Sequence, residues 1–393
     1  MFTRIFLAIF IFLTFSYGET FKEILEKALE SSPYLKSIKY SVKSYEGQIL
    51  QAKRNFNPQV QVEFGRLISQ TDSGFALTNL QISQQLRLWG EKYLAIKSAG
   101  LRKKAQEYFY EAQKRIFEGN LYQIFYEILY IDAQIKIKEK EVALLNQLKK
   151  FIDHKYKFGE ALIIDVLRID RDISIVKSKL ETLKALKQAK ETLFFAFAGI
   201  NPVKIEGNFE ELNINLAKPT NFPLISYYEL LIKSYNTQIK RQKALAKPQV
   251  YIGLVAGEDA VDLGKYEFGI NISSSLPVFY KNEGQIISLV NQKSQVLQKK
   301  RQVEFQYEAK LKSLGMQINA LKKQLETVKK TAILKLQNAL EIAQKGYQEG
   351  TVSFLELSSI RKQYFETLNL KASLIYEIHK TYGEYIKIGG LEI

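Results

Sequence analysis

Long helices dominate the pattern of apolar and polar positions along the chain. Between residues 121 and 145 apolar side chains recur every three or four positions, apart from a polar break at Lys138, and residues 314–328 repeat that spacing in the second half. A nearly heptad repeat keeps one apolar seam against a neighbouring helix along its whole length. Lys and Glu fill the other positions, which indicates a solvated face. The pattern predicts two helical hairpins, over residues 90–199 and 280–389.

Four shorter segments alternate apolar and polar side chains, with Gln84 as an exception. They cover about residues 59–67, 79–88, 249–257 and 266–278. This period predicts strands with one apolar face, and the segments suit tilted membrane strands, which need about 9–11 residues. The opposite face is rich in Gln, Asn, Ser and Gly, as is typical of a water-filled lumen. A small soluble sheet capping a helical rod is the alternative interpretation.

The alternation assigns each strand residue to a face. We expect Val62, Phe64, Ile82, Ile252 and Ile270 to face lipid, and Gln61, Gln81, Tyr251 and Asn271 to face the lumen. Trp89 and the pair Phe279 and Tyr280 follow the second and fourth segments, where an interfacial aromatic belt would lie. Four strands cannot close a barrel, and an open strand edge cannot lie in lipid. Membrane strands therefore predict an oligomer, in which three chains would supply about twelve strands and room for a channel.

The order of these segments repeats along the chain. Residues 57–60 (NPQV) recur as 247–250 (KPQV), residues 82–86 (ISQQL) as 272–276 (ISSSL), and Tyr156-x-x-Gly159 as Tyr347-x-x-Gly350. Three motifs in the same order at a nearly constant offset predict an internal duplication. The first repeat would span residues 19–200 and the second residues 223–393. A linker with several Pro residues, 201–222, separates them.

The first 18 residues have the pattern of a secretory signal peptide. Arg4 supplies the positive charge, an apolar run covers Ile5–Phe15, and small residues precede a cut after Gly18. The run is shorter than the about 20 apolar residues of a spanning helix. We therefore expect an exported mature chain that begins at Glu19.

Composition removes most chemistry from consideration. The 393 residues include no Cys and two His, with a formal net charge of +16. Thiolate metal sites, iron–sulfur clusters and cysteine nucleophiles are thereby excluded. His154 and His379 are expected on the surface, and Asp170 and Asp172 are expected to be solvated. With no P-loop, nucleophile elbow or HExxH motif, we expect no enzyme, no cofactor and no metal. Because the basic residues are interleaved with acids, we expect no nucleic-acid partner.

Together, the duplication, the export signal, the strand pairs and the long hairpins resemble the TolC-like outer membrane efflux proteins. The most specific points are residues 82–90 (ISQQLRLWG), residues 272–284 and the two Tyr-x-x-Gly tips. The resemblance implies a mainly helical fold with a β-barrel part. Long hairpins would form a periplasmic α-barrel, and four strands per chain would contribute to a trimeric 12-stranded transmembrane β-barrel in the outer membrane. Many relatives carry a lipid-modified Cys at the mature N-terminus, which this chain lacks.

The resemblance also implies a function. The protein would be the outer-membrane exit duct of a tripartite efflux or type I secretion system, a passive conduit from periplasm to exterior. Its partners would be two further copies of itself, a periplasmic adaptor protein, an inner-membrane transporter and outer-membrane lipid. The transported substrate, whether drug, metal or protein, is not specified by the sequence. An exported coiled-coil structural or adhesion protein is the alternative; it accounts for the heptads but not for four matched strands.

Two sets of site residues follow from the resemblance. The family places adaptor contact at the hairpin tips, and a periplasmic gate near them. Asp165, Tyr347 and Glu356 match gate positions, and carboxylates crowded there would have raised pKa values. Val352 stands where an Arg completes the family's latch. There are two simpler alternatives. The tip glycines serve only to reverse the chain, and Asp165 and Glu356 serve only to stabilise the first turns of their helices through the helix dipole. The expected tip residues are Gly159, Glu160, Ala161, Leu162, Gly350, Thr351, Val352 and Ser353.

Overall fold

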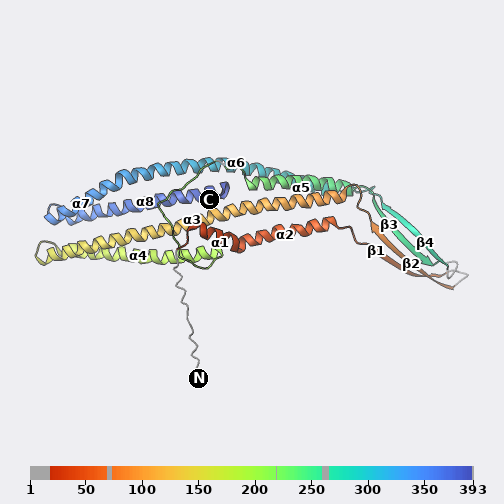
Figure 1. Ribbon diagram of the computed structural model, residues 1–393, viewed down its shortest axis with the longest axis horizontal. Coiled ribbons are helices and arrows are strands. Elements are labelled where there is room, and N and C mark those ends of the chain that lie inside the picture. The colour runs from red at the N-terminus through yellow and green to blue at the C-terminus, as the bar shows by residue number, and fades with distance from the viewer. Residues whose placement is uncertain (1–17, 69–72, 218, 259–264, 392–393) are drawn as a thin grey trace, which may run out of the picture. The chain divides into compact units, whose positions relative to one another are not determined.

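The computed structural model describes residues 18–68, 73–217, 219–258 and 265–391. The expected signal peptide lies outside the described residues, apart from Gly18. The first half contains α1 (Phe21–Ser31), α2 (Pro33–Lys53), β1 (Gln59–Ile68), β2 (Ser73–Gln85), α3 (Glu91–Lys157) and α4 (Ile163–Ala198). The second half contains α5 (Pro223–Leu245), β3 (Gln249–Glu258), β4 (Tyr266–Ser275), α6 (Glu283–Thr327), α7 (Ile333–Glu349) and α8 (Phe354–Gly389) (Figure 1). From α2 onward, the two halves present their elements in the same order, as an internal duplication predicts.

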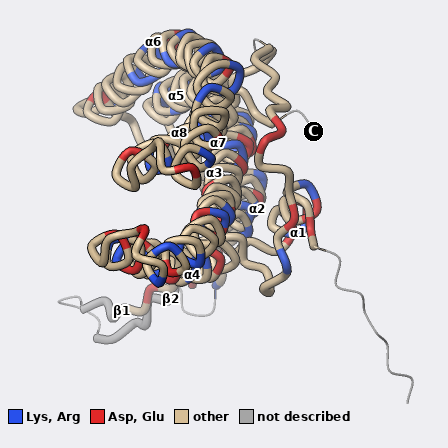
Figure 2. The backbone as a smooth tube through the Cα atoms, turned by 90° about the vertical axis from the view of Figure 1, so that its left-hand side faces the viewer, with Lys and Arg blue, Asp and Glu red and all other residues tan. Residues whose placement is uncertain are grey.

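The chain divides into two compact units. The strand unit consists of Leu35–Gln113 and Asn221–Ala309, and the helical unit consists of Met1–Tyr34, Lys114–Thr220 and Lys310–Ile393. The helices α2, α3 and α6 contribute residues to both units. Basic and acidic residues are interspersed along the helices (Figure 2). Among the described helices, none combines the length and the apolar character needed to cross a bilayer.

The strand unit contains one antiparallel sheet in the order β1-β2-β3-β4. Val62 lies opposite Leu80, and Ile82 lies opposite Leu254, so that apolar residues share one face across the strands. This apolar face is not covered by other parts of the unit: Phe268 is 82% exposed and Ile270 is 73% exposed. The other exposed members are Val60, Val62, Phe64, Leu80, Ile82, Ile252, Leu254 and Ile272.

Two of the expected strand ends are wrong. The second strand ends at Gln85 rather than Leu88, because Arg87 turns away from the sheet to pair with Glu91, and Trp89 and Gly90 have positive φ. The fourth strand ends at Ser275 rather than Val278, because Pro277 has no N–H to donate to a ladder. The second strand also begins earlier than expected, at Ser73, since its pairing with β1 continues to Ile68.

Long apolar seams form the core of the helical unit, as the heptad pattern predicts. Leu121, Ile128 and Leu145 of α3 are buried, and so are Leu314, Ile318 and Leu325 of α6. The second long stretch is not one uninterrupted α-helix, because a π-helical turn at Val328–Ala332 separates α6 from α7. It also begins at Glu283 rather than near residue 280. Val328 nevertheless stays in the apolar cluster with Leu325, so the seam continues through the turn.

His379 is fully buried, so the expectation that it lies on the surface is wrong. The Tyr122 hydroxyl lies 2.8 Å from Nδ1, and Nε2 lies 3.3 Å from the Phe209 carbonyl oxygen. The ring also stacks on Tyr126 at 3.6 Å between centroids. His379 is buried because α8 packs there against α3, which supplies Tyr122 and Tyr126, and against Phe209. Burial lowers the pKa of His379 to about 4, so its imidazole is neutral at physiological pH. His154, by contrast, is exposed as expected.

Two glycines allow α3 and α8 to approach closely in the helical unit. A Cβ on Gly119 would lie 2.6 Å from the Gly383 carbonyl oxygen, and one on Gly383 would lie 2.3 Å from Cγ of Gln123. Real Cβ atoms essentially never lie this close to another heavy atom, and the Gly383 carbonyl is backbone, which cannot move aside as the end of a flexible side chain can. Gly100 provides the contrast, because a Cβ built on this other glycine of α3 meets nothing within 4 Å.

We expect Gly119→Ala to lower the free energy of unfolding by about 1–3 kcal/mol, as overpacking does. This loss should exceed the about 1 kcal/mol by which Ala improves on Gly in a helix. Gly100→Ala is the matched control and should be neutral or stabilising. Denaturant unfolding followed by circular dichroism measures both. A Gly119→Ala protein as stable as the Gly100→Ala protein would contradict the close approach.

We expect the stability that His379 contributes to be lost in acid. The folded-state pKa of about 4 lies below the usual 6.5, so the contribution is complete above pH 6.5 and declines as the pH falls towards 4. At about 1.36 kcal/mol per pH unit, full protonation would cost roughly 3 kcal/mol. Unfolding midpoints measured from pH 7 to pH 4 should fall less steeply in His379→Gln, whose amide cannot titrate. Parallel pH profiles for both proteins would refute this account.

Candidate functional site

Both expected tips form the turns of helical hairpins. Between α3 and α4, Gly159 has a φ of 77° and its N–H donates to the Tyr156 carbonyl at 3.0 Å. Between α7 and α8, Gly350 has a φ of 79°, and the N–H of Thr351 donates to the Gly346 carbonyl at 2.8 Å. A left-handed conformation favours glycine, which explains why both tip motifs have a glycine at this turn position. The geometry fits chain reversal, and adaptor contact at the turns stays a prediction.

Two of the three expected gate residues come together at the tips. Tyr347 is buried, and its ring packs against Phe151 and Phe354 at 6.0 Å between centroids. Burial, and then the nearby carboxylate of Asp165, raise the pKa of the Tyr347 hydroxyl. The Asp165 carboxylate also lies 3.5 Å from a guanidinium nitrogen of Arg168. Asp165 of the first hairpin therefore acts electrostatically on Tyr347 of the second.

Glu356 is occupied by a local role. The N–H and hydroxyl of Ser353 both donate to its carboxylate at 2.9 Å, and the Glu356 N–H donates back to the Ser353 hydroxyl at 3.2 Å. This reciprocal arrangement is a capping box at the start of α8. The Ser353 bonds lower the pKa of Glu356, which is the opposite of the rise expected from crowding. Within one chain, the simpler helix-start interpretation therefore describes Glu356.

Lys155 is a tip residue that the sequence reasoning missed. Its ammonium donates to the carbonyl oxygens of Tyr347 at 3.1 Å and Gln348 at 3.0 Å, which end α7. It also lies 5.3 Å from the Phe151 ring centroid and 5.4 Å from that of Tyr347. A cation at the carbonyl end of a helix is favourable. Lys155 thus joins the first hairpin to the second. The chain has Val352 at the position where the resemblance implied a latch Arg. The only sequence signal was a Lys in the last turn of a helix, which is common.

A buried ion pair also joins α4 to α8. The carboxylate of Asp172 accepts hydrogen bonds from Arg361 at 2.6 Å and from Arg171 at 2.7 Å. Arg361 is 2% exposed, and Asp172 is buried, so the expectation that Asp172 is solvated is wrong. These guanidinium groups hold the pKa of Asp172 below its usual range, although burial alone would raise it. Asp170, which pairs with Lys149, stays half-exposed. Removing either buried partner would leave a buried charge, which is strongly destabilising.

At the strand-to-helix junction, the expected interfacial aromatics are exposed. The Trp89 indole N–H donates to the Pro248 carbonyl at 2.8 Å, and Lys247 lies over its ring. Phe279 is fully exposed, and Tyr280 is more than half exposed. An indole with one apolar face and one satisfied N–H is typical of a membrane interface.

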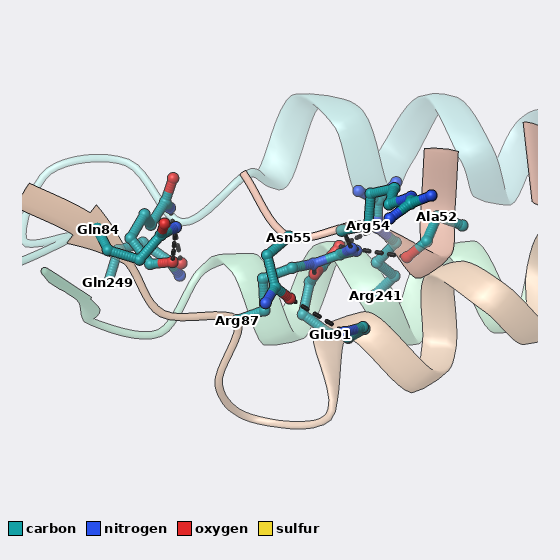
Figure 3. Close-up of polar contacts among 10 residues, drawn as sticks. Ala52, Arg54, Asn55, Gln84, Arg87, Glu91, Arg241 and Gln249 are labelled. Carbon is teal, nitrogen blue, oxygen red and sulfur yellow. Dashed lines mark hydrogen bonds and ion pairs between the residues drawn. The ribbon is translucent and has the colours of Figure 1, made fainter. Parts of the chain in front are cut away.

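A second charged cluster, which the sequence reasoning missed, fixes the same junction (Figure 3). Arg87 donates to Glu91 at 2.6 and 3.1 Å, and to the carbonyl oxygens of Ala52 and Arg54 at 2.6 Å. Arg241 of α5 donates to the same carboxylate at 2.6 Å. The two guanidinium groups outweigh burial and lower the pKa of Glu91. Arg87 therefore ties the end of α2 to the start of α3.

Comparisons with known proteins agree with this architecture. The family model described as outer membrane efflux protein matches residues 24–199. The cobalt-zinc-cadmium resistance protein CzcC of Cupriavidus metallidurans is 17% identical over 356 residues, which cover 88% of this chain and 84% of CzcC.

Solved structures share the fold over nearly the whole chain. The outer membrane protein VceC of Vibrio cholerae superposes with a TM-score of 0.78 at 15% identity, covering 94% of this chain and 97% of VceC. The Campylobacter jejuni CmeC outer membrane channel gives a TM-score of 0.79 at 13% identity, covering 95% of this chain and 87% of CmeC. The first half of the chain thus matches the outer membrane efflux protein family model, and nearly the whole chain shares its fold with solved outer membrane channels.

Proposed function

We propose that three copies of the mature chain form an exit duct through the outer membrane, which a periplasmic adaptor and an inner-membrane transporter dock to export substrate. The observation that carries this proposal is the uncovered apolar face of the sheet. Residues such as Phe268 and Ile270 would expose a large apolar patch to water in a soluble monomer. In a membrane the same face contacts hydrocarbon.

The proposed trimer also accounts for the edges of the sheet. In each chain β1 and β4 have a sheet neighbour on one side only. Backbone groups on a free edge cannot be satisfied in lipid. Pairing β4 of one copy with β1 of the next satisfies both edges, and three copies give a closed barrel of about twelve strands with room for a channel.

In the proposed duct, the hairpin tips form the periplasmic end. Gly159–Leu162 and Gly350–Ser353 would receive the adaptor. Asp165 and Glu356 of three copies would form a ring of carboxylates, which favours cations at the narrow end. Lys155 would take the place of the family's latch Arg, because it joins the first hairpin to the carbonyl end of α7.

We expect the native protein to be recovered from the outer-membrane fraction as a detergent-requiring trimer. Mass determination in detergent measures this. Ile270→Lys, on the apolar face, should lower the yield of trimer, since a Lys near the bilayer midplane costs about 2–4 kcal/mol. Asn271→Lys is the matched control on the polar face and should assemble normally. A stable monomer, full recovery in the soluble periplasmic fraction, or equal yields of the two variants would overturn the proposal.

We expect Lys155→Met to make the closed state of the duct less stable. The substitution keeps an unbranched apolar stem and removes the charge that binds the α7 carbonyls. Hydrogen bonds from charged groups contribute about 1.5–3 kcal/mol, so the open population should rise about tenfold or more. Single-channel recording in planar bilayers measures this population.

Lys157→Met is the control for the Lys155 prediction. Lys157 is exposed and lies two residues further along the same turn. Lys157→Met channels should conduct like the unmodified protein, because among the described residues the Lys157 side chain makes no hydrogen bond or ion pair with the second hairpin. Channels of Lys155→Met that stay as closed as those of Lys157→Met would show that Lys155 is not a latch.

A further inference from the structure

A cavity of about 750 Å³ lies within the strand unit, where α2 ends and α3 begins. The last turns of α2, the residues that lead into β1, the first turns of α3, and α5 line it. Ala95, Ser98 and Ala99 of α3 have small side chains, which leave the space open. The lining includes Arg54, Arg87, Arg102 and Arg241 but no Asp or Glu. We call this space the Arg cavity.

The described residues of the unit do not fully neutralise the arginines of the Arg cavity. Arg87 and Arg241 share one carboxylate, that of buried Glu91, and Arg241 uses only its Nε for this bond. Arg102 donates to the neutral amide of Gln238 at 3.1 Å. The Arg54 side chain has no ion pair among the described residues. These four guanidinium groups and the one carboxylate that two of them contact carry three more positive charges than negative ones.

This arrangement has the chemistry of an oxyanion site. A guanidinium group presents a planar fork of N–H donors that matches phosphate oxygens. Gathering like charges is unfavourable unless an anion of opposite charge lies between them. Arg241, Arg102 and Arg54 each keep terminal N–H groups that no described residue accepts. A phosphate, with several oxygens and one or two charges, would satisfy donors from different helices at once.

We propose that the Arg cavity binds the phosphate group of a phospholipid headgroup. The assignment to lipid rests on the proposed function, in which the strands span the membrane. The lining residues Asn57 and Arg87 stand two residues from Gln59, where β1 begins, and from Gln85, where β2 ends. At about 3.3 Å per residue, the cavity lies within about 10 Å of the strand ends, at headgroup depth. Exposed Leu50 and Phe56 add apolar contact at its lining.

The test is calorimetric titration of the full-length mature protein in an uncharged detergent. The probes are dihexanoyl-phosphatidylglycerol and, separately, inorganic phosphate. The test variant is Arg54→Gln with Arg102→Gln, because neither arginine belongs to the Glu91 cluster. The matched control is Lys53→Gln with Lys104→Gln, which removes the same charge from adjacent exposed positions outside the cavity.

We expect the test variant to bind the lipid about tenfold more weakly or worse, and the control to bind within about twofold of the unmodified protein. Equal affinities for the two double variants would overturn the site. If inorganic phosphate binds as tightly as the lipid and competes with it, the oxyanion site stands and the lipid assignment fails. The titration requires neither membrane insertion nor transport, so its failure is distinguishable from a failure of the proposed duct.

Discussion

The constraint on which the rest of the structure depends is that hydrocarbon cannot satisfy a backbone hydrogen bond. A chain that places strands in lipid must close them into a barrel, and four strands per chain are too few. In the proposed trimer, lipid covers the apolar face and neighbouring copies pair with the edge strands. Under that proposal, assembly is a requirement for the fold in the membrane. The helices carry no such requirement, because their backbone bonds close within each helix.

The periodic parts of this fold could be predicted from the sequence, and the parts set by single tertiary contacts could not. The apolar seams that contain Ile128 of α3 and Ile318 of α6 follow from residue spacing alone. The same holds for the alternation of apolar and polar residues in the strands that contain Ile82 and Ile252. The end of β2 does not, because Leu86-Arg87-Leu88 continues the alternation. Leu86 keeps one backbone bond to Val250 of β3, but Arg87 pairs with Glu91, four positions on, and the strand ends there.

In the candidate site, too, the local features could be predicted and the contacts between distant segments could not. The tip glycines were found because a positive φ leaves a mark in the sequence. Lys155 and His379 were missed for one physical reason. Each acts through atoms of a segment distant in sequence, Lys155 through the Tyr347 carbonyl and His379 through Tyr122 and the Phe209 carbonyl. Periodicity describes only a residue's own helix. The partner of a polar side chain on another helix is set by packing, which a single sequence by itself does not display.

The two hairpin turns, although related by the apparent duplication, are not stabilised alike. In the second turn, Ser353 and Glu356 form a full capping box, and Val352 packs against Gly346. In the first turn, Leu162 begins α4 with no side-chain cap. A missing cap costs about 0.5–2 kcal/mol, so the second turn is the better held of the two by its own residues. The contact that joins the turns starts from the first, at Lys155, and ends on backbone carbonyls of α7. In the proposed gate the first turn, which lacks a cap, is the weaker of the two, and the Asp172–Arg361 pair and the Phe151–Tyr347 ring contact join its hairpin to the second one together with Lys155.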